Sequence, residues 1–308
     1  DGYVGKPPEL GTGVFAMDLG VGNSSDPAFL SGFPVDFAIY TEPAGGSARS
    51  VGARLLGSKK VVASSNEAES NDTKAMWDNN GGYGINRNSD FIAWMWKRHV
   101  GCDVVCYPGQ EFEGRQIPHS LNAVPEMILV KNRTNVSENW AVYHKGLNGG
   151  TNPEQYYLRL NTDAAEIDNT FWYDTAPTST HFSVAFSAGQ TNQDDKDYLA
   201  MLFASVSGIS SVGSFTGPDP EATITIDCGF QPRFVMIKCA SHARDWVVFD
   251  TVRGIAAGAD KKLALNTTAA QVTTEDMIDL TSSGFSLPHG TYLDTNWAGR
   301  EFIYYAHA

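Results

Sequence analysis

The chain has 308 residues and a formal net charge of −13, because 22 Lys and Arg residues stand against 35 Asp and Glu residues. This length is enough to bury a hydrophobic core without disulfide bonds or a structural metal. The negative charge disfavours both nucleic acid and an anionic membrane surface as partners. No apolar run approaches the roughly 18 residues that a membrane-spanning helix needs, so the sequence predicts no membrane insertion.

Taken in chain order, three stretches repeat one pattern. Each stretch opens with a proline before an apolar run and closes with an acidic residue before an aromatic run. The prolines are Pro34, Pro125 and Pro232, and the acidic residues are Asp90, Asp197 and Glu301. We therefore predict three diverged copies of one unit, over residues 1–100, 101–206 and 207–308. The first copy is shorter, and we expect it to be a capping copy with an N-terminal arm.

The apolar runs of the second and third copies predict buried strands. Residues 127–130 and 234–237 are apolar at every position, which is typical of strands covered on both faces. Glycine-rich turns are frequent, and no stretch has a sustained helical stripe with caps. Short helical turns are expected at 162–167 and 267–272. The sequence thus predicts an all-β fold of three tandem β-sandwich-like repeats that pack closely or share strands.

Tryptophan recurs at one position of the repeat. Trp140 and Trp246 occupy equivalent places in the second and third copies, whereas the first copy has Arg49 at about that place. Trp140, Trp246 and Trp94 lie in apolar strands, so we expect all three in the core.

Three other aromatic residues are candidates for ligand binding. Trp172, Tyr173 and Trp297 lie beside polar turns, where an exposed ring could stack on a carbohydrate or contact a protein partner. For the two tryptophans, core packing is an equally good interpretation.

The densest run of acidic residues is a candidate metal site. Asp194, Asp195 and Asp197 could help to hold a Ca²⁺ ion together with nearby carbonyl groups. The run lacks the glycine and the terminal glutamate of an EF-hand loop, so a solvated turn is the simpler interpretation. No other cofactor is indicated.

No motif of nucleophilic, metal-dependent or nucleotide-dependent catalysis is present, so the sequence predicts a non-enzymatic protein with no catalytic residues. The seven histidines are scattered without ligand spacing. The four cysteines are expected to be free and mostly buried thiols. A Cys102–Cys106 bridge remains possible, but it would close a very small loop.

The repeated motifs as a set resemble a known family. They include PEMILVKNR from Pro125, LRLNTDAAE from Leu158, DWVVFDTVRG from Asp245 and FIYYAHA from Phe302. Together they are similar to a repeat region in structural and tail-fibre-like proteins of tailed bacteriophages, especially marine cyanophages and pelagiphages. The resemblance extends over roughly residues 14–308.

This resemblance implies a bacteriophage virion surface protein: a tail fibre, tail appendage or capsid decoration with a structural or host-attachment role. It also implies a homo-oligomer, with a trimer as the first expectation. Other virion proteins and a host surface glycan or protein are the expected partners.

Two alternatives remain open from the sequence. A carbohydrate-binding, lectin-like module would need Trp172 or Trp297 exposed in a groove near Asn and Asp side chains. A polysaccharide depolymerase would need two carboxylates facing each other across a cleft.

Overall fold

A computed structural model describes residues 10–22, 26–186, 188–256, 258–289 and 292–308 of the chain. Residues 1–9 of the expected N-terminal arm lie outside this range. Over the described residues the chain forms β-strands joined by turns and short 3-10 turns, and no α-helix. The predicted all-β class is therefore confirmed.

Three main antiparallel sheets contain most of the strands. The first consists of β1 (Phe15–Leu19), β3 (Phe37–Thr41), β4 (Ser50–Ala53), β5 (Lys59–Val62), β6 (Ser70–Asn71) and β8 (Ile92–Trp96). The second consists of β9 (Cys102–Pro108), β11 (Met127–Asn132), β12 (Ala141–His144) and β16 (Asp197–Phe203). The third consists of β17 (Ser210–Thr216), β19 (Phe234–Cys239), β20 (Val247–Asp250), β21 (Asp260–Ala264), β22 (Val272–Glu275) and β25 (Glu301–His307). We call the segments that carry these sheets, residues 15–96, 102–203 and 210–307, the first, second and third units.

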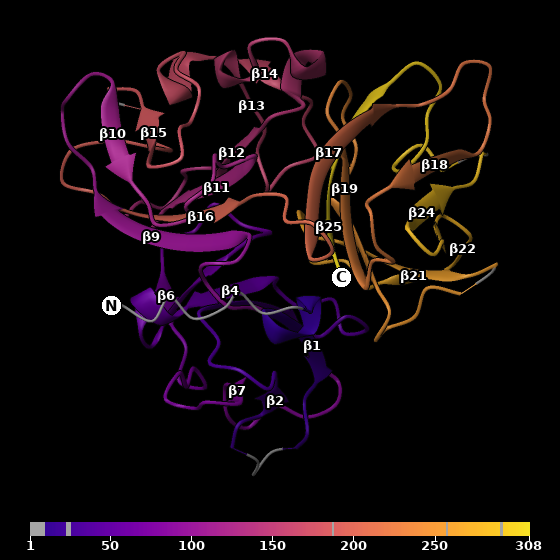
Figure 1. The fold of residues 1–308 in the computed structure, drawn as a ribbon. Helices are drawn as coiled ribbons and strands as arrows, with labels where there is room; N and C mark the ends of the chain where they lie inside the picture. Colours follow the sequence, from indigo (N-terminus) through magenta and orange to yellow (C-terminus); the bar gives the residue numbers. More distant parts are fainter. Residues whose placement is uncertain (1–9, 23–25, 187, 257, 290–291) are drawn as a thin grey trace, which may run out of the picture.

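The three main sheets share one strand order. The order is β1-β8-β3-β4-β5-β6 in the first unit, β9-β16-β11-β12 in the second and β17-β25-β19-β20-β21-β22 in the third. In each unit the first strand therefore pairs with the last, and the last pairs with the strand that follows the repeat proline. Figure 1 shows the units as three lobes that meet at the middle of the molecule.

Smaller sheets cover one face of each main sheet. They pair β2 (Phe29–Leu30) with β7 (Gly82–Tyr83), β10 (Arg115–Pro118) with β15 (His181–Val184), β13 (Tyr156–Tyr157) with β14 (Ile167–Asp168), and β24 (Gly284–Leu287) with both β18 (Ile224–Asp227) and β23 (Asp279–Leu280). The 3-10 turns are η1 (Gly11–Gly13), η2 (Arg54–Leu56), η3 (Leu147–Gly150), η4 (Pro153–Gln155) and η5 (Thr170–Trp172). Each unit is a two-layer arrangement with its own apolar core between the layers.

The opposite face of every main sheet points into one shared central core. In β8, Trp94 and Trp96 belong to this central core, whereas Met95 packs in the core of the first unit, as the two-residue period of a strand requires. The last strands of the other units contribute Phe203 and Tyr305, whose ring centroids lie 4.9 Å apart. Trp96 Nε1 donates a hydrogen bond to the Tyr305 hydroxyl at 3.1 Å, so the first and third units also make a polar contact at the centre.

A ring of side-chain hydrogen bonds closes around this core. One side chain of each unit donates to a backbone carbonyl of another unit. The donor is a tryptophan in the second and third units and an arginine at the corresponding position of the first unit. The bonds are Trp140 Nε1 to Val62 O at 2.9 Å, Trp246 Nε1 to Arg159 O at 2.9 Å and Arg49 Nε to Ala264 O at 2.9 Å. The second unit thus bonds to the first, the third to the second and the first to the third.

A second ring, made by backbone groups, runs in the opposite direction. Its bonds are Glu69 N–H to Arg133 O, Glu166 N–H to Ala240 O and Gln271 N–H to Pro43 O, each at 2.8 Å. Two of these donors lie in the segments 162–167 and 267–272, for which short helical turns were expected. That expectation is wrong, because these segments are not helical and pair with a neighbouring unit instead.

Within the described residues, no helix has both the length and the apolar character that crossing a bilayer requires.

Candidate functional site

The candidate ligand-binding residue Trp172 lies in the core of the second unit. Its side chain is 2% exposed, and its Nε1 donates to Tyr156 O at 3.1 Å. The ring meets that of Tyr143 edge to face at a centroid distance of 5.9 Å. The buried ring therefore offers no face to a ligand, and core packing is the interpretation that the structure favours.

The next residue, Tyr173, lies on the surface. It is 43% exposed and ends the turn η5 with a φ of 56°, in the left-handed region. Gly114 lies directly beside its ring, since a Cβ added at position 114 would come within 2.4 Å of Tyr173 Cε1. The absence of a side chain at 114 thus lets the tyrosine ring lie against the backbone of the loop between β9 and β10.

Tyr173 lines a hollow of about 380 Å³ on the second unit. The other lining residues are Glu113, Thr170, Asp174, Ala185 and Phe186. The hollow therefore combines two aromatic rings with two carboxylates and a hydroxyl group. Aromatic surface with a few polar groups around it is the usual composition of a small-ligand site.

The exposed aromatic residues of the described chain all belong to this region of the second unit. Phe186 is 45% exposed and Phe112, next to the lining residue Glu113, is 64% exposed. Exposed aromatic rings that gather in one region often mark a binding surface. The sequence did not reveal this grouping, because its residues come from loops far apart in the chain.

The third aromatic candidate, Trp297, lies on the third unit, whereas Tyr173 lies on the second. It is partly buried against the core of that unit. Two guanidinium groups lie over its ring, with Cζ at 4.6 Å for Arg244 and 5.0 Å for Arg300 from the ring centroid. The structure thus does not bring the three predicted ligand-binding residues together into one site.

The acidic residues Asp194 and Asp195 are exposed in the loop before β16, and the exposed Asp197 is the first residue of that strand. In the part of the chain that the structure describes, no group of three His, Cys, Asp or Glu side chains is placed to hold a metal ion. The three carboxylates are therefore not gathered around one point, and the Ca²⁺ site stays a prediction.

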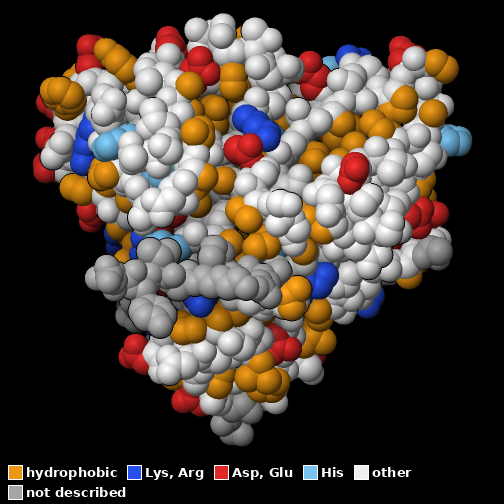
Figure 2. Space-filling view, viewed as in Figure 1, with side chains coloured by type: hydrophobic (Ala, Val, Ile, Leu, Met, Phe, Trp, Pro, Cys, Tyr) orange, Lys and Arg blue, Asp and Glu red, His pale blue; other side chains and the backbone are white. Residues whose placement is uncertain are grey.

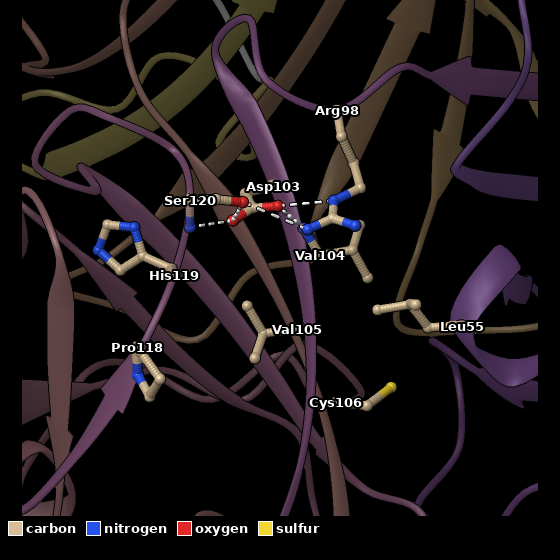
Figure 3. A pocket seen from close by; sticks show the side chains of 9 residues that line it. All are labelled: Leu55, Arg98, Asp103, Val104, Val105, Cys106, Pro118, His119 and Ser120. Atoms are coloured by element: carbon tan, nitrogen blue, oxygen red, sulfur yellow. Dashed lines mark hydrogen bonds and ion pairs between the residues drawn. The ribbon is translucent and has the colours of Figure 1, made fainter.

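A second hollow, of about 370 Å³, lies where the first unit meets the second (Figure 3). One of its lining residues is Asp103, on β9, whose carboxylate is buried. The carboxylate accepts hydrogen bonds from Arg98 Nε at 2.7 Å, from Ser120 N–H at 2.7 Å and from Val104 N–H at 2.8 Å. Burial alone would raise the pKa of Asp103, but the Ser120 N–H and the Arg98 guanidinium hold it below its usual value.

Ser120, His119 and Asp103 do not form a nucleophilic triad, although they are close together. Ser120 Oγ bonds directly to Asp103 at 3.0 Å, and the imidazole is not between them. His119 Nε2 lies 3.1 Å from Thr178 O, and its Nδ1 accepts from Leu121 N–H at 3.3 Å. In Figure 3 the ring points away from Asp103. A triad requires the imidazole to bridge the nucleophile and the carboxylate, so these three residues do not have the geometry of a nucleophilic site.

The thiol nearest to this hollow, Cys106, is partly buried, and burial raises its pKa. A raised pKa keeps a thiol protonated and therefore a poor nucleophile. All four cysteines are free.

The family described as a domain of unknown function (DUF7483) matches residues 47–308 of the chain. The matched range includes the whole second and third units and the first unit from Ser47 onward. No curated protein and no solved structure matches the chain.

Proposed function

The chain belongs to the DUF7483 family, and from this premise we propose that it is a non-enzymatic attachment protein of a bacteriophage particle surface that binds a host saccharide in the hollow beside Tyr173. The observation that carries the proposal is that two of the three exposed aromatic residues of the described chain, Tyr173 and Phe186, line that hollow, and that the third, Phe112, directly precedes the lining residue Glu113. A sugar ring stacks its C–H face on an aromatic ring, and its hydroxyl groups bond to carboxylates such as Glu113 and Asp174.

The resemblance of the repeat motifs to tailed-phage structural proteins supports the setting of the proposal. On that basis the chain is a tail fibre, tail appendage or capsid decoration, and it assembles with itself, as a trimer, and with other virion proteins. Many weak contacts on one particle then add up to firm attachment, because linked sites raise the effective concentration of each other.

The proposal predicts that the purified protein binds bacterial surface saccharides on a glycan array. Tyr173→Ala and Phe186→Ala should each weaken binding by about tenfold, the loss that corresponds to about 1.4 kcal/mol of stacking energy. Leu30→Ala removes a similarly exposed apolar side chain from the first unit and is the matched control with unchanged binding. An antibody against the chain should label the surface of phage particles in electron micrographs.

Two results would refute the proposal. If no saccharide binds, or if both aromatic variants bind as well as the unaltered protein, the hollow is not the binding site. If the antibody does not label phage particles, the protein is not part of the particle surface.

Glycan cleavage is the second candidate function, because Glu113 and Asp174 line the same hollow and a pair of carboxylates is the machinery of most glycosidases. The same experiment decides between the two functions. If the bound saccharide is recovered intact after prolonged incubation, the protein is a binder. If shorter products form and Glu113→Gln abolishes them, the protein is a depolymerase.

A further inference from the structure

Trp297 is surrounded by basic side chains. Besides the guanidinium groups of Arg244 and Arg300 over its ring, the imidazole of His242 meets the ring edge to face, with a centroid distance of 4.9 Å. The loop that carries Trp297 is held by Gly217, the residue after β17, since Gly217 N–H donates to Arg300 O at 2.9 Å. A Cβ at position 217 would lie 2.1 Å from Trp297 O, so only glycine allows this close approach. The cluster is therefore a fixed feature of the third unit.

The two guanidinium groups have most of their hydrogen-bonding capacity free. An arginine side chain has five N–H donors. Arg244 uses one of them, from Nη1 to Ala243 O at 3.2 Å, and within the described structure the Arg300 side chain donates to no protein group. The Nε atoms of both residues are buried without a partner. Stacking on Trp297 holds these donors in place without consuming them.

Among the residues that the structure describes, no carboxylate lies within ion-pair distance of the two guanidinium groups. Among the described residues, neither Arg244 nor Arg300 takes part in an ion pair, although other arginines of the chain do, for example Arg98 with Asp103 and Arg133 with Glu69. In a chain of net charge −13, two adjacent cations without an acidic partner form a local site for an anion.

We propose that Arg244, Arg300 and Trp297 form a second binding site, for an acidic sugar that carries a sulfate or carboxylate group. The anionic group binds the free N–H groups of the two arginines, because a guanidinium donates in pairs to planar or tetrahedral oxyanions. The Trp297 ring holds the two guanidinium groups in place for this contact. The site lies on the third unit and does not depend on the Tyr173 hollow of the second.

The direct test is calorimetric titration with three ligands. Two are acidic, a sulfated oligosaccharide and a uronic acid oligosaccharide, and both should bind. The third is the sulfated oligosaccharide after removal of its sulfate groups, which is uncharged and should not bind. Arg244→Gln and Arg300→Gln should each weaken binding at least tenfold, because each removes charge-assisted hydrogen bonds.

Arg115→Gln is the matched control. Arg115 also lies over an aromatic ring, 5.6 Å from the centroid of Tyr107. Its guanidinium, however, already donates to Pro108 O and to Asn192 Oδ1. The substitution should therefore leave the binding of acidic sugars unchanged.

A spectroscopic readout on the unaltered protein makes the test independent of substitutions. Desolvation and the positive charges of Arg300 and Arg244 lower the pKa of His242. An anion bound between these arginines offsets their charge, so saturating sulfated oligosaccharide should raise the pKa of His242 in an NMR titration. Inorganic sulfate should cause the same shift at higher concentration.

The proposal fails if the uncharged sugar binds as well as the acidic ones, if both glutamine variants keep full affinity, or if the pKa of His242 does not rise with bound ligand. The Tyr173→Ala variant separates this site from the proposed attachment site. It should keep its affinity for acidic sugars even where its binding to the glycan array is lost.

Discussion

Arg49 shows how a residue of different chemistry can make the bond to a neighbouring unit that tryptophan makes in the other two units. It is completely buried and donates through Nε to Ala264 O, the bond that a tryptophan makes in the other units. Its remaining nitrogens donate to Thr41 Oγ1 at 3.1 Å and to the carbonyls of Ser47 and Ala269. The arginine therefore satisfies loop carbonyls that an indole could not reach.

The other two units satisfy the equivalent carbonyl with a buried lysine. Lys131 Nζ donates to Glu138 O at 2.6 Å, and Lys238 Nζ donates to Arg244 O at 2.8 Å. Burial lowers the pKa of both lysines to about 8. The first unit has Thr41 at the lysine position. Two units thus combine a tryptophan with a lysine, and the first unit combines an arginine with a threonine. Both combinations provide one buried cation that donates to the equivalent backbone carbonyl.

This pairing predicts strong coupling between positions 49 and 41. Arg49→Trp should lower the free energy of unfolding by about 3 kcal/mol, because it leaves buried carbonyls such as that of Ser47 unpaired. Thr41→Lys alone should also destabilise, since it places a second buried cation beside the arginine. The double variant recreates the arrangement of the other units and should recover at least about 1 kcal/mol relative to additivity.

Urea unfolding of the four proteins in a double-mutant cycle measures this coupling. If the losses of stability in the two single variants simply add in the double variant, the arginine–threonine pair and the tryptophan–lysine pair are not equivalent. The sequence placed Arg49 at the tryptophan position, but it did not reveal the compensation, because Thr41 ends β3, Arg49 directly precedes β4, and only the fold defines how these two strands pair.

At the scale of the elements, alternation and turn residues predicted the strands well. The runs at 127–130 and 234–237 are buried on both faces as expected, because one face packs in its own unit and the other in the shared centre. The segments 162–167 and 267–272 were mistaken for helical turns, because a local pattern contains no information about a partner in another unit. The three-repeat origin of the chain, which the common strand order supports, remains a prediction.

The candidate site was predictable only in part. Tyr173 is exposed, but Trp172 beside it is buried. Both lie in one polar-looking stretch, and the turn η5, which sends neighbouring side chains in different directions, decides which ring is exposed. Phe186 and Glu113 carried no signal, since their proximity to Tyr173 arises from loop packing.

Two buried histidines at strand ends make stability depend on pH. His144 ends β12, where its Nε2 lies 3.3 Å from Tyr304 O and its Nδ1 accepts from Gly146 N–H at 3.0 Å. His307 ends β25 and stacks on Phe15 at a centroid distance of 4.4 Å. Burial lowers the pKa of each imidazole to about 3.

A histidine whose pKa is lower in the folded than in the unfolded state favours unfolding in acid. The unfolded chain takes up the proton below pH of about 6.5, so stability falls as the pH drops from there toward 3. Between pH 6.5 and 5, each histidine should cost about 2 kcal/mol of unfolding free energy. His144→Gln should remove one such contribution, so the free energy of unfolding of this variant should fall less steeply with decreasing pH than that of the unaltered protein. Urea unfolding at several pH values measures this difference. Parallel pH profiles would contradict the buried, neutral state of His144.

At the scale of the whole molecule, the three units share one centre within a single chain. The rings of hydrogen bonds and the central core use the inner face of every main sheet. Acidic side chains lie along the outer rims of the lobes and also near the middle of the face in Figure 2. A trimer of chains, which the phage resemblance implies, would therefore have to form through the outer surfaces, the small sheets and loops that also carry the proposed sugar sites.

A closed ring also predicts how the chain unfolds. Each unit bonds to both of the others, so weakening one junction should lower the stability of all three. Trp246→Phe removes the bond from Nε1 to Arg159 O between the third and second units and should cost about 1–2 kcal/mol. Native-state hydrogen exchange measures this cost separately in the last strand of each unit. The slowest amides of β8, β16 and β25 should lose the same protection, whereas Phe112→Ala on the exposed loop should leave all three unchanged. Faster exchange confined to β25 and β16, with β8 unaffected, would mean that the first unit is stable by itself and that the ring does not couple the units.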